Sequence, residues 1–568
     1  MAAGLIPSVA ANIGAGWGLC LLTLLATALW LRYRANVEKF TAQKDANNGT
    51  NLPAPKFPYF FPILGSLPLA YLWNPKSLVL NPNNIFQGPK PVVHVKILHQ
   101  DFYLLRGAEN LKSLFRASWA CTHVAFVKFA LSYAFGTSAK ALSLYDRDDS
   151  GANHAPHPDS TVEARNRIDF LVDQSNHRLL EGPGLNPLWN RYLDNITNQL
   201  RSLYDKDVGT EWESRHDFMD LMTNQVTLAI LDALCGPGLL KTSPDFMHHF
   251  LEFDKNLQTY MQGMPWFLAP RAYLARRRVL KAVRDWQQYA RDNYTSSTHY
   301  KGDAGQNDDP FWGSSYFRER HDMFLQMGQG EYDHAAIASS DFGFIWAMRN
   351  TITATCWTLY EIYRDPDLLS TVRSEISCCL APSPSASGGS ECSSPNLNFN
   401  LDALLRSCPT LSAVYAETLR LRTHFYLVRM GDRSPLSIPP YTIPPRKAVV
   451  ALTTVAHFDQ SAWNTERPLD EFWPGRFLKT DDEGKVAFST KGLEGSWVPY
   501  GGGSRQCPGR HFAKRQILMT TAMMLNLFDV EVVEDKVAEH LDLWGFGSGV
   551  SRPVGRVGVR IRRRRDAV

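Results

Sequence analysis

The sequence has no Cys-x-x-Cys pair and no strong excess of charge of either sign. Its nine cysteines, an odd number in 568 residues, fit reduced thiols better than a disulfide framework. Lys and Arg number 60 against 56 Asp and Glu, so the formal net charge of +4 offers no electrostatic argument for nucleic-acid binding. No repeat of solenoid or propeller period is present. With 44% hydrophobic residues, the composition is globular and excludes disordered and fibrous proteins.

Charged residues are absent from the stretch 2–31. Residues 13–31 within it are nearly all apolar and long enough, as a helix, to cross the hydrocarbon core of a membrane. A cleaved signal peptide is the alternative, but no basic residue precedes the run and its apolar stretch is too long. Arg32 and Arg34 follow at once, so the positive-inside rule predicts a single-pass anchor with residues 32–568 in the cytosol.

Closely spaced prolines follow the predicted anchor. Because proline removes backbone donors and stiffens the chain, they predict a rigid neck. The prolines are Pro53, Pro55, Pro58 and Pro62. We therefore divide the chain into an anchor (1–31), a basic and proline-rich neck (32–70) and a body (71–568).

Helical patterning dominates from about residue 110 onwards, and strand-like segments are short. Residues 335–364 form a long apolar segment closed by Asp365 and Pro366, which predicts one central helix. Residues 92–98 with 102–105 predict a β-hairpin. Further candidate strands are 426–430, 447–454 and 557–561. The expected fold class is mainly α with small β-sheets.

One cysteine lies in a glycine-rich segment that precedes a predicted helix. The chain there reads Tyr500-Gly-Gly-Gly-Ser-Arg-Gln-Cys507-Pro508-Gly509. Consecutive glycines allow positive φ and a close approach of the backbone to a ligand. The positive end of the following helix dipole favours a thiolate at Cys507. A small buried cysteine in a turn is the alternative, but a thiolate on such a loop predicts an iron ligand.

The string Tyr-Gly-x-Gly-x-Arg-x-Cys-Pro-Gly resembles the haem-binding loop of the cytochrome P-450 superfamily. The resemblance implies that residues 71–568 form a haem-thiolate catalytic domain with the P-450 fold, holding haem b through Cys507. It also implies that Arg505 pairs with a haem propionate. Tyr500 departs from the usual phenylalanine but retains an aromatic ring. The implied cofactor-binding residues of the loop are Tyr500, Gly501, Gly503, Arg505, Cys507 and Gly509.

Two further segments resemble the same superfamily. Glu417 and Arg420 carry its Glu-x-x-Arg motif, and their spacing places both charges on one face of a helix. Such a pair is weak evidence by itself, because exposed pairs of this spacing are common. Arg476 lies in Phe-Trp-Pro-Gly-Arg-Phe, which is similar to the Pro-x-Arg-Phe element. The resemblance implies that the three charges form a buried ionic triad with a structural role.

The predicted central helix departs from the superfamily pattern. The family usually carries Ala/Gly-Gly-x-Asp/Glu-Thr there, whose acid and alcohol relay protons to dioxygen. Here the chain reads Trp346-Ala-Met-Arg-Asn350-Thr351, and no carboxylate is present. In one register Asn350 replaces the threonine; in the other it replaces the acid and Thr351 is the threonine.

This stretch resembles the branch that contains sterol 7α-hydroxylases and prostacyclin synthase. That resemblance implies that Asn350 and Thr351 are catalytic, with the Asn350 amide facing dioxygen or substrate. An asparagine bonded to its own helix backbone is the alternative.

The Trp-x-x-x-Arg motif that commonly binds a haem propionate is absent. Either His177 or Arg178, in a predicted helix, is a candidate substitute, and a surface role for each is the alternative. Arg429 is a third candidate by family position.

The resemblance implies a microsomal monooxygenase, single-pass in the endoplasmic reticulum membrane with a cytosolic catalytic domain. Electrons are expected from an NADPH-cytochrome P-450 reductase, because the chain has no flavin or dinucleotide fingerprint. The expected substrate is a lipophilic sterol, terpenoid or other secondary metabolite. An isomerase or dehydratase that needs no dioxygen is the first alternative, motivated by the missing carboxylate, and a non-catalytic haem-binding protein is the second.

Overall fold

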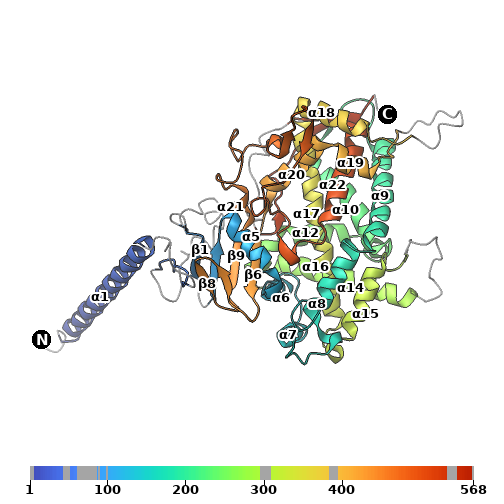
Figure 1. The fold of residues 1–568 in the computed structure, drawn as a ribbon. Helices are drawn as coiled ribbons and strands as arrows, with labels where there is room; N and C mark the ends of the chain where they lie inside the picture. The colour runs from blue at the N-terminus through green and yellow to red at the C-terminus, as the bar shows by residue number, and fades with distance from the viewer. Residues whose placement is uncertain are drawn as a thin grey trace. The chain divides into compact units, whose positions relative to one another are not determined.

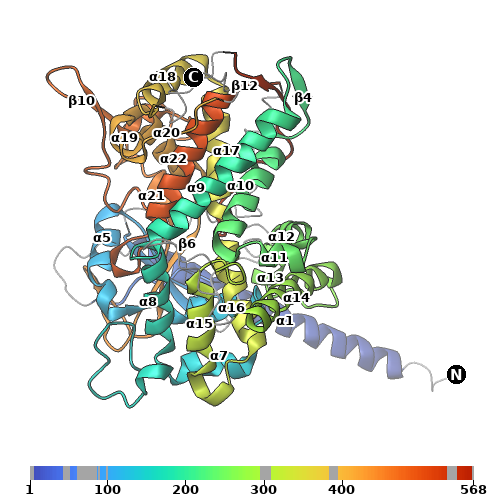
Figure 2. The same ribbon diagram turned by 90° about the vertical axis from the view of Figure 1, so that its right-hand side faces the viewer.

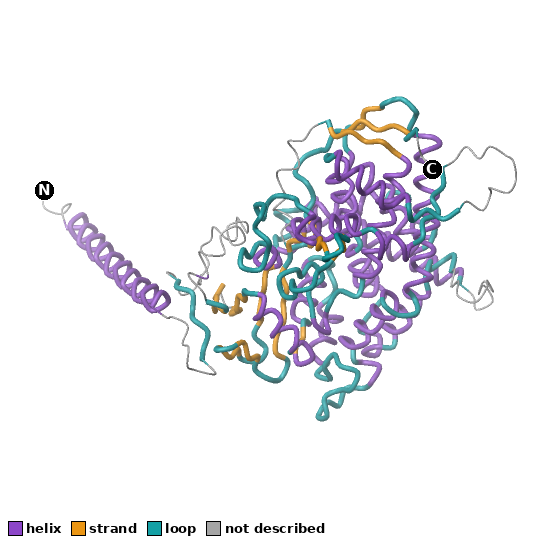
Figure 3. Tube along the Cα trace, turned by 45° about the horizontal axis from the view of Figure 1, so that its top comes forward, coloured by secondary structure: helices purple, strands orange, loops and turns teal. Residues whose placement is uncertain are grey.

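The computed structural model describes residues 6–42, 52–59, 86, 90–97, 100–294, 309–382, 395–533 and 547–565. Helices make up most of the described chain, and the strands are short, as the colouring in Figure 3 shows. The predicted class, mainly α with small β-sheets, is confirmed. Residues 43–51 and 60–70 of the predicted neck lie outside the described residues.

The elements are labelled in Figure 1. The helices are α1 (Ile6–Ala42), α5 (Ala108–Arg116), α6 (Val124–Tyr133), α7 (Ala139–Arg147), α8 (Ile168–Leu180), α9 (Leu185–Ser202), α10 (Phe218–Cys235), α11 (Gly238–Thr242), α12 (Phe246–Lys255), α13 (Leu257–Met261), α14 (Pro270–Asn293), α15 (Ser315–Leu325), α16 (His334–Ala347), α17 (Arg349–Tyr363), α18 (Pro366–Ser377), α19 (Leu401–Ser407), α20 (Pro409–Arg422), α21 (Thr453–His457) and α22 (Arg510–Leu527). The strands are β1 (Val92–Ile97), β2 (Gln100–Leu105), β3 (Cys121–Thr122), β4 (Glu213–Arg215), β5 (Thr423–His424), β6 (Tyr426–Gly431), β7 (Leu436–Ile438), β8 (Tyr441–Ile443), β9 (Ala448–Leu452), β10 (Leu478–Thr480), β11 (Val486–Phe488), β12 (Phe528–Val532), β13 (Gly549–Val550) and β14 (Val559–Arg563).

The predicted anchor lies within α1, which continues past residue 31 to Ala42. In the part of the chain that the structure describes, no helix combines the length and the apolar character needed to span a membrane. The anchor therefore stays a prediction.

The chain divides into two compact units, of which the first comprises Met1–Cys121 and Tyr426–Val455. Its sheet places β1, β2, β9 and β6 side by side. The predicted hairpin is confirmed, because β1 and β2 pair antiparallel with Val92 opposite Leu105. The candidate strand at 426–430 is confirmed as β6, which pairs antiparallel with β9. The candidate at 447–454 is confirmed over the residues of β9, whereas residues 453–454 begin α21. Valines and leucines fill the buried positions of β1 and β2, as β-branched and apolar side chains do on a half-buried sheet.

The second unit comprises Thr122–Phe425 and Ala456–Val568, and long helices form its core. Figure 2 shows α9, α10, α17 and α22 running beside one another, and α20 also packs on α17. Every residue from 352 to 363 in α17 and from 516 to 527 in α22 is buried. A helix that is apolar on all sides is stable only when other helices surround it, so these two form the centre of the bundle. Short sheets lie within this unit, in the orders β12-β14-β4, β13-β5 and β10-β11.

The prediction of one unbroken central helix is wrong in one detail. The structure divides the segment into α16 and α17, with Met348 between them. The hydroxyl of Thr351 donates to the Met348 carbonyl over 3.0 Å, and the Asn350 amide donates to the Ala347 carbonyl over 3.2 Å. Side chains that bond local carbonyls compete with the helical ladder, which explains the break. The predicted end is confirmed, because α17 stops at Tyr363 and Asp365 caps α18.

Candidate functional site

Cys507 lies on a loop that folds back on itself before α22. Its backbone N–H donates to the Tyr500 carbonyl over 3.0 Å, and the N–H of Gln506 donates to the Gly503 carbonyl over 3.1 Å. Gly501 and Gly503 have φ values of 70° and 72°, in the left-handed region that favours glycine. The glycines therefore allow the tight turn that carries Cys507 to the start of the helix.

The Cys507 thiol is accessible, yet protein surrounds it on its other sides. Burial raises the pKa of this thiol, while hydrogen bonds from the backbone N–H groups of Gly509 and Arg510 and the charge of Arg510 act to lower it. A Cβ atom at Gly509 would lie 3.7 Å from the Cys507 Sγ, so the backbone comes within ordinary contact of the sulfur. The backbone N–H donors and the accessible side of the Cys507 sulfur together favour a thiolate when a metal cation binds to the sulfur.

Acidic side chains of α8 pair with Arg505, two residues before Cys507. The Arg505 guanidinium lies 3.4 Å from an oxygen of Asp169 and 3.2 Å from one of Asp173. The Arg505 side chain is only 7% exposed. These carboxylates hold it against α8, so the structure places this predicted propionate ligand beside the cysteine loop.

His177 contacts two acidic side chains of the same region. Its Nδ1 lies 2.7 Å from Glu181 and its Nε2 lies 3.8 Å from Asp173. Glu181 also pairs with Arg510. Burial acts to raise the pKa of Glu181, but the hydrogen bonds from His177 and Arg510 prevail and lower it. His177 is thus joined to both arginines that flank the cysteine.

The other candidate on α8 lies elsewhere. Arg178 is exposed and pairs with Glu319 of α15 over 3.0 Å.

Sequence reasoning also missed the acids of α8, although a signal was present. Positions 169, 173, 177 and 181 recur every four residues, which aligns ionisable side chains along one helix face.

Tyr500 has a partner that the sequence did not reveal. Its hydroxyl lies 2.8 Å from the hydroxyl of Tyr415 on α20. Burial raises the pKa of Tyr500 well above 10, and the nearby Tyr415 and Cys507 act in the same direction. The extra hydroxyl relative to phenylalanine is therefore satisfied inside the protein by a second tyrosine.

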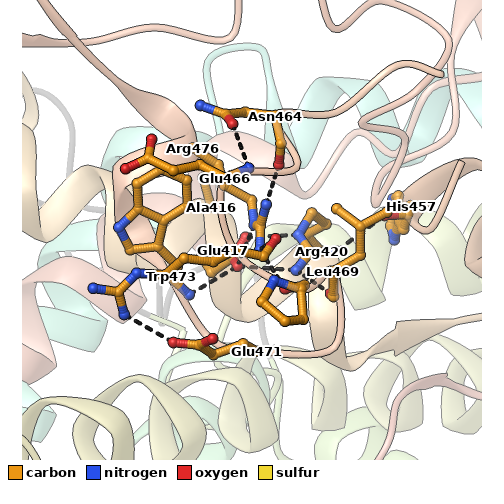
Figure 4. Close-up of polar contacts among 12 residues, drawn as sticks. Ala416, Glu417, Arg420, His457, Asn464, Glu466, Leu469, Glu471, Trp473 and Arg476 are labelled. Carbon is orange, nitrogen blue, oxygen red and sulfur yellow. Dashed lines mark hydrogen bonds and ion pairs between the residues drawn. The ribbon is translucent and has the colours of Figure 1, made fainter. Parts of the chain in front are cut away.

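Glu417, Arg420 and Arg476 come together next to Trp473, as Figure 4 shows. Two nitrogens of Arg420 donate to Glu417 over 2.7 and 2.9 Å, and the Arg476 Nε lies 3.3 Å from it. The backbone N–H of Trp473 donates to the same carboxylate over 3.0 Å. The side chains of all three charged residues are 0% exposed. Backbone carbonyls, including that of His457, accept the remaining guanidinium protons.

The break between α16 and α17 exposes a short face of an otherwise buried helix. Ala347 is exposed, and Asn350 and Thr351 are half-buried. Besides donating to the Ala347 carbonyl at the end of α16, Asn350 accepts a hydrogen bond from the Val550 backbone N–H over 2.9 Å. The predicted catalytic role of Asn350 and Thr351 stays a prediction.

The remaining candidate, Arg429, lies in β6 of the first unit. Its side chain is buried, and its Nη1 donates to the neighbouring Val428 carbonyl over 2.9 Å. Its assignment to a haem propionate stays a prediction.

The family model described as cytochrome P450 matches residues 184–554, more than half of the chain. The chain belongs to the cytochrome P450 family. This match confirms the superfamily predicted from the cysteine loop. Its relatives are named monooxygenases, so this P450 is an oxidoreductase that incorporates molecular oxygen.

Fungal and mammalian proteins are among the similar sequences. The cytochrome P450 monooxygenase fsoE of Humicola fuscoatra is 31% identical over 427 residues, 70% of this chain and 71% of the relative. The cytochrome P450 monooxygenase efuG of Hormonema carpetanum is 29% identical over 457 residues, 75% of this chain and 79% of the relative. Cholesterol 7-alpha-monooxygenase of Cricetulus griseus is 26% identical over 319 residues, 55% of this chain and 58% of the relative. The last likeness agrees with the predicted 7α-hydroxylase branch.

Members of this family bind haem through an axial cysteine thiolate, and the residues present fit that group. The accessible Cys507 thiol receives backbone N–H donors, which suits a sulfur that carries negative charge. Arg505 provides a cation beside the loop for a propionate. This P450 is a haem protein.

Proposed function

We propose that this P450 hydroxylates or otherwise oxidises a lipophilic small molecule, a sterol, terpenoid or other secondary metabolite. The single observation that carries the proposal is Cys507, accessible on one side and held by backbone donors at the start of α22. Haem bound there supplies the activation of dioxygen and the oxidation of a C–H bond. Cys507 is the proposed axial ligand.

The other residues bind, orient and brace in this proposal. Arg505 and His177, joined through Asp173, are the proposed contacts of propionate oxygen. Glu417 and its two arginines keep the core beneath the loop rigid. At the helix break, Asn350 offers an amide N–H to a polar atom of dioxygen or substrate. The Thr351 hydroxyl, which donates to the Met348 carbonyl, offers an acceptor oxygen.

A sterol is one candidate substrate, because one relative is named for acting on cholesterol. The fungal relatives carry no substrate in their names. Trp346 and Ala347, at the end of α16, present mainly apolar surface, which supports a lipophilic molecule and no narrower class.

Electrons are proposed to come from an NADPH-cytochrome P450 reductase. Support comes from the sequence, which carries no flavin or dinucleotide fingerprint of its own. Product formation that rises with added reductase and saturates would support this partner, whereas turnover independent of reductase would contradict it.

We further propose attachment to the endoplasmic reticulum membrane through residues 13–31, with the catalytic body in the cytosol. The apolar run and the basic residues that follow it support this orientation. On α1 the side chains of Leu21, Leu24 and Leu25 are each more than half exposed, which suits contact with lipid. A chain beginning at residue 32 should move from the membrane pellet to the supernatant, and equal retention of both forms would contradict the proposal.

The decisive experiment supplies candidate substrate, reductase and NADPH under isotopically labelled dioxygen. Label in the product supports oxygenation of the substrate. Turnover without reductase or NADPH would instead favour an isomerase or dehydratase acting on an already oxygenated substrate. The absence of the family's usual carboxylate from the stretch 346–351 is the observation behind that second candidate.

A further inference from the structure

Two adjacent side chains at the start of α17 form hydrogen bonds with the same residue of strand β13, near the C-terminal end of the chain. The N–H of Val550 donates to the Asn350 Oδ1 over 2.9 Å, and the Arg349 Nη2 donates to the Val550 carbonyl over 3.4 Å. Both peptide groups of Val550 are thus bound by the helix. On its other side β13 pairs antiparallel with β5, where Val550 lies opposite Thr423.

A buried acid from α12 neutralises the arginine of this contact. The Arg349 Nε lies 2.7 Å from an Asp254 oxygen, and their side chains are 5% and 4% exposed. The Trp346 indole N–H donates to the same carboxylate over 2.9 Å. The Arg349 Nη1 also donates to the Ser548 carbonyl over 3.2 Å. A buried guanidinium without such a counterion would be strongly destabilising, so Asp254 makes the contact possible.

Gly549 gives the Asn350 side chain the space that it occupies. Its φ is 111°, a conformation that other residues rarely adopt. A Cβ atom at this position would lie 2.2 Å from the Asn350 Oδ1, which is closer than any real contact. The backbone conformation and the packing therefore both require glycine beside Asn350.

The hydrogen bonds also determine which way the Asn350 amide points. An N–H donor at Val550 requires the oxygen on that side, and the Ala347 carbonyl requires the nitrogen on the other. The nitrogen carries a second proton, because an amide has two N–H donors. Held in this way, the side chain can donate to an oxygen atom at the helix break, and it cannot pass on a proton as a carboxylic acid would.

We propose that Arg349, Asn350, Gly549 and Asp254 form a clamp on Val550 that positions the Asn350 amide as a hydrogen-bond donor for the reaction. The donor role rests on the proposed function, because it places the reacting oxygen atoms at the helix break. Arg349, Gly549 and Asp254 are positioning residues that act through Asn350 and the strand. The group that the donor recognises is an oxygen acceptor on dioxygen or on the lipophilic substrate.

Hydrogen–deuterium exchange at the Val550 amide tests the clamp in the full-length haem-loaded protein. Asn350→Ala removes the acceptor, so exchange of the Val550 amide should accelerate roughly tenfold, as expected for the loss of one amide hydrogen bond. Asn350→Asp keeps an acceptor oxygen for the Val550 N–H but loses the hydrogen bond to the Ala347 carbonyl, so the Val550 amide should stay better protected than in Asn350→Ala. Asn256→Ala is the matched control, because the Asn256 side-chain amide donates to the Glu252 carbonyl of the preceding helix α12. Unchanged exchange in Asn350→Ala would overturn the clamp.

The Asn350→Asp variant also separates a donor role from a purely structural one. It keeps the acceptor for the Val550 N–H but removes the N–H donor, so the C–O stretching band of the reduced carbon monoxide complex should move relative to the unsubstituted protein. Superimposed bands would overturn the donor role. Failure to form a thiolate-type carbon monoxide complex in the unsubstituted protein would instead refute the proposed function, and the exchange measurement would still decide the clamp.

Gly549→Ala provides a second, independent variant. Its Cβ atom would displace the Asn350 oxygen, so the Val550 amide should lose protection in this variant as well. In the Asn350→Ala background, Gly549→Ala should change exchange of the Val550 amide less, because the Asn350 oxygen that the new Cβ atom would meet is absent. Fully additive effects on exchange would contradict the contact between these two residues.

Discussion

Replacing Glu417 by glutamine tests how strongly one buried carboxylate stabilises the protein through Arg420, Arg476 and Trp473. Glu417 accepts two hydrogen bonds from Arg420, one from Arg476 and one from the Trp473 backbone. The Glu417→Gln variant keeps the volume of the side chain. It removes the negative charge and turns an N–H group toward guanidinium donors.

The expected loss is large because two buried cations share this counterion. Removing one partner of a buried ion pair typically costs about 3–5 kcal/mol of unfolding free energy. Backbone carbonyls also accept from Arg420 and Arg476, which offsets part of the loss and keeps the estimate within that range. The free energy of unfolding should therefore fall by about 3–5 kcal/mol.

Urea unfolding followed by tryptophan fluorescence measures the change, with haem absorbance as a second probe. Glu471→Gln is the matched control, because Glu471 pairs with Arg467 over 2.8 Å on the surface, with side chains 44% and 52% exposed. An exposed pair contributes only about 0–1 kcal/mol. If Glu417→Gln is no more destabilising than Glu471→Gln, the reasoning about the buried carboxylate is refuted.

Two further predictions concern buried polar groups near the same region. Tyr500→Phe leaves the Tyr415 hydroxyl without its 2.8 Å partner and should lower stability by about 1–3 kcal/mol, with haem still bound; a double change with Tyr415→Phe should recover most of the loss in thermal unfolding. Burial and the charge of Arg420 lower the pKa of His457 well below 6.5, so it stays neutral in the fold while the unfolded chain gains a proton as the pH falls. Stability should therefore decline below about pH 6.5, by about 1.4 kcal/mol per pH unit for this group; His457→Gln should reduce the slope, and an unchanged slope would contradict the assignment.

Local features of the fold could be predicted from the sequence. The hairpin of β1 and β2, the helical character of the core and the helix end before Asp365 each depend on residues close together in the chain. The turn around Cys507 was equally visible, because Gly501 and Gly503 permit the backbone conformation that the loop adopts.

Contacts between distant segments could not be predicted. Asn350, at the break after Ala347, accepts a hydrogen bond from Val550, which lies 200 residues away in the sequence. The sequence shows Arg349 only as one charge within an apolar segment. Its counterion, Asp254, comes from another helix. The pairing of Arg505 with Asp169 joins residues 336 positions apart. Such pairs become visible only when the packing of the helices is known.

The reduced carbon monoxide spectrum of Cys507→Ala tests the central claim most directly. The unsubstituted protein should show the red-shifted Soret band from which the family takes its name. Cys378→Ala is the matched control, since Cys378 is also exposed but lies after α18, and it should show the same band. The account predicts that Cys507→Ala loses this band, and a retained band in that variant would contradict it.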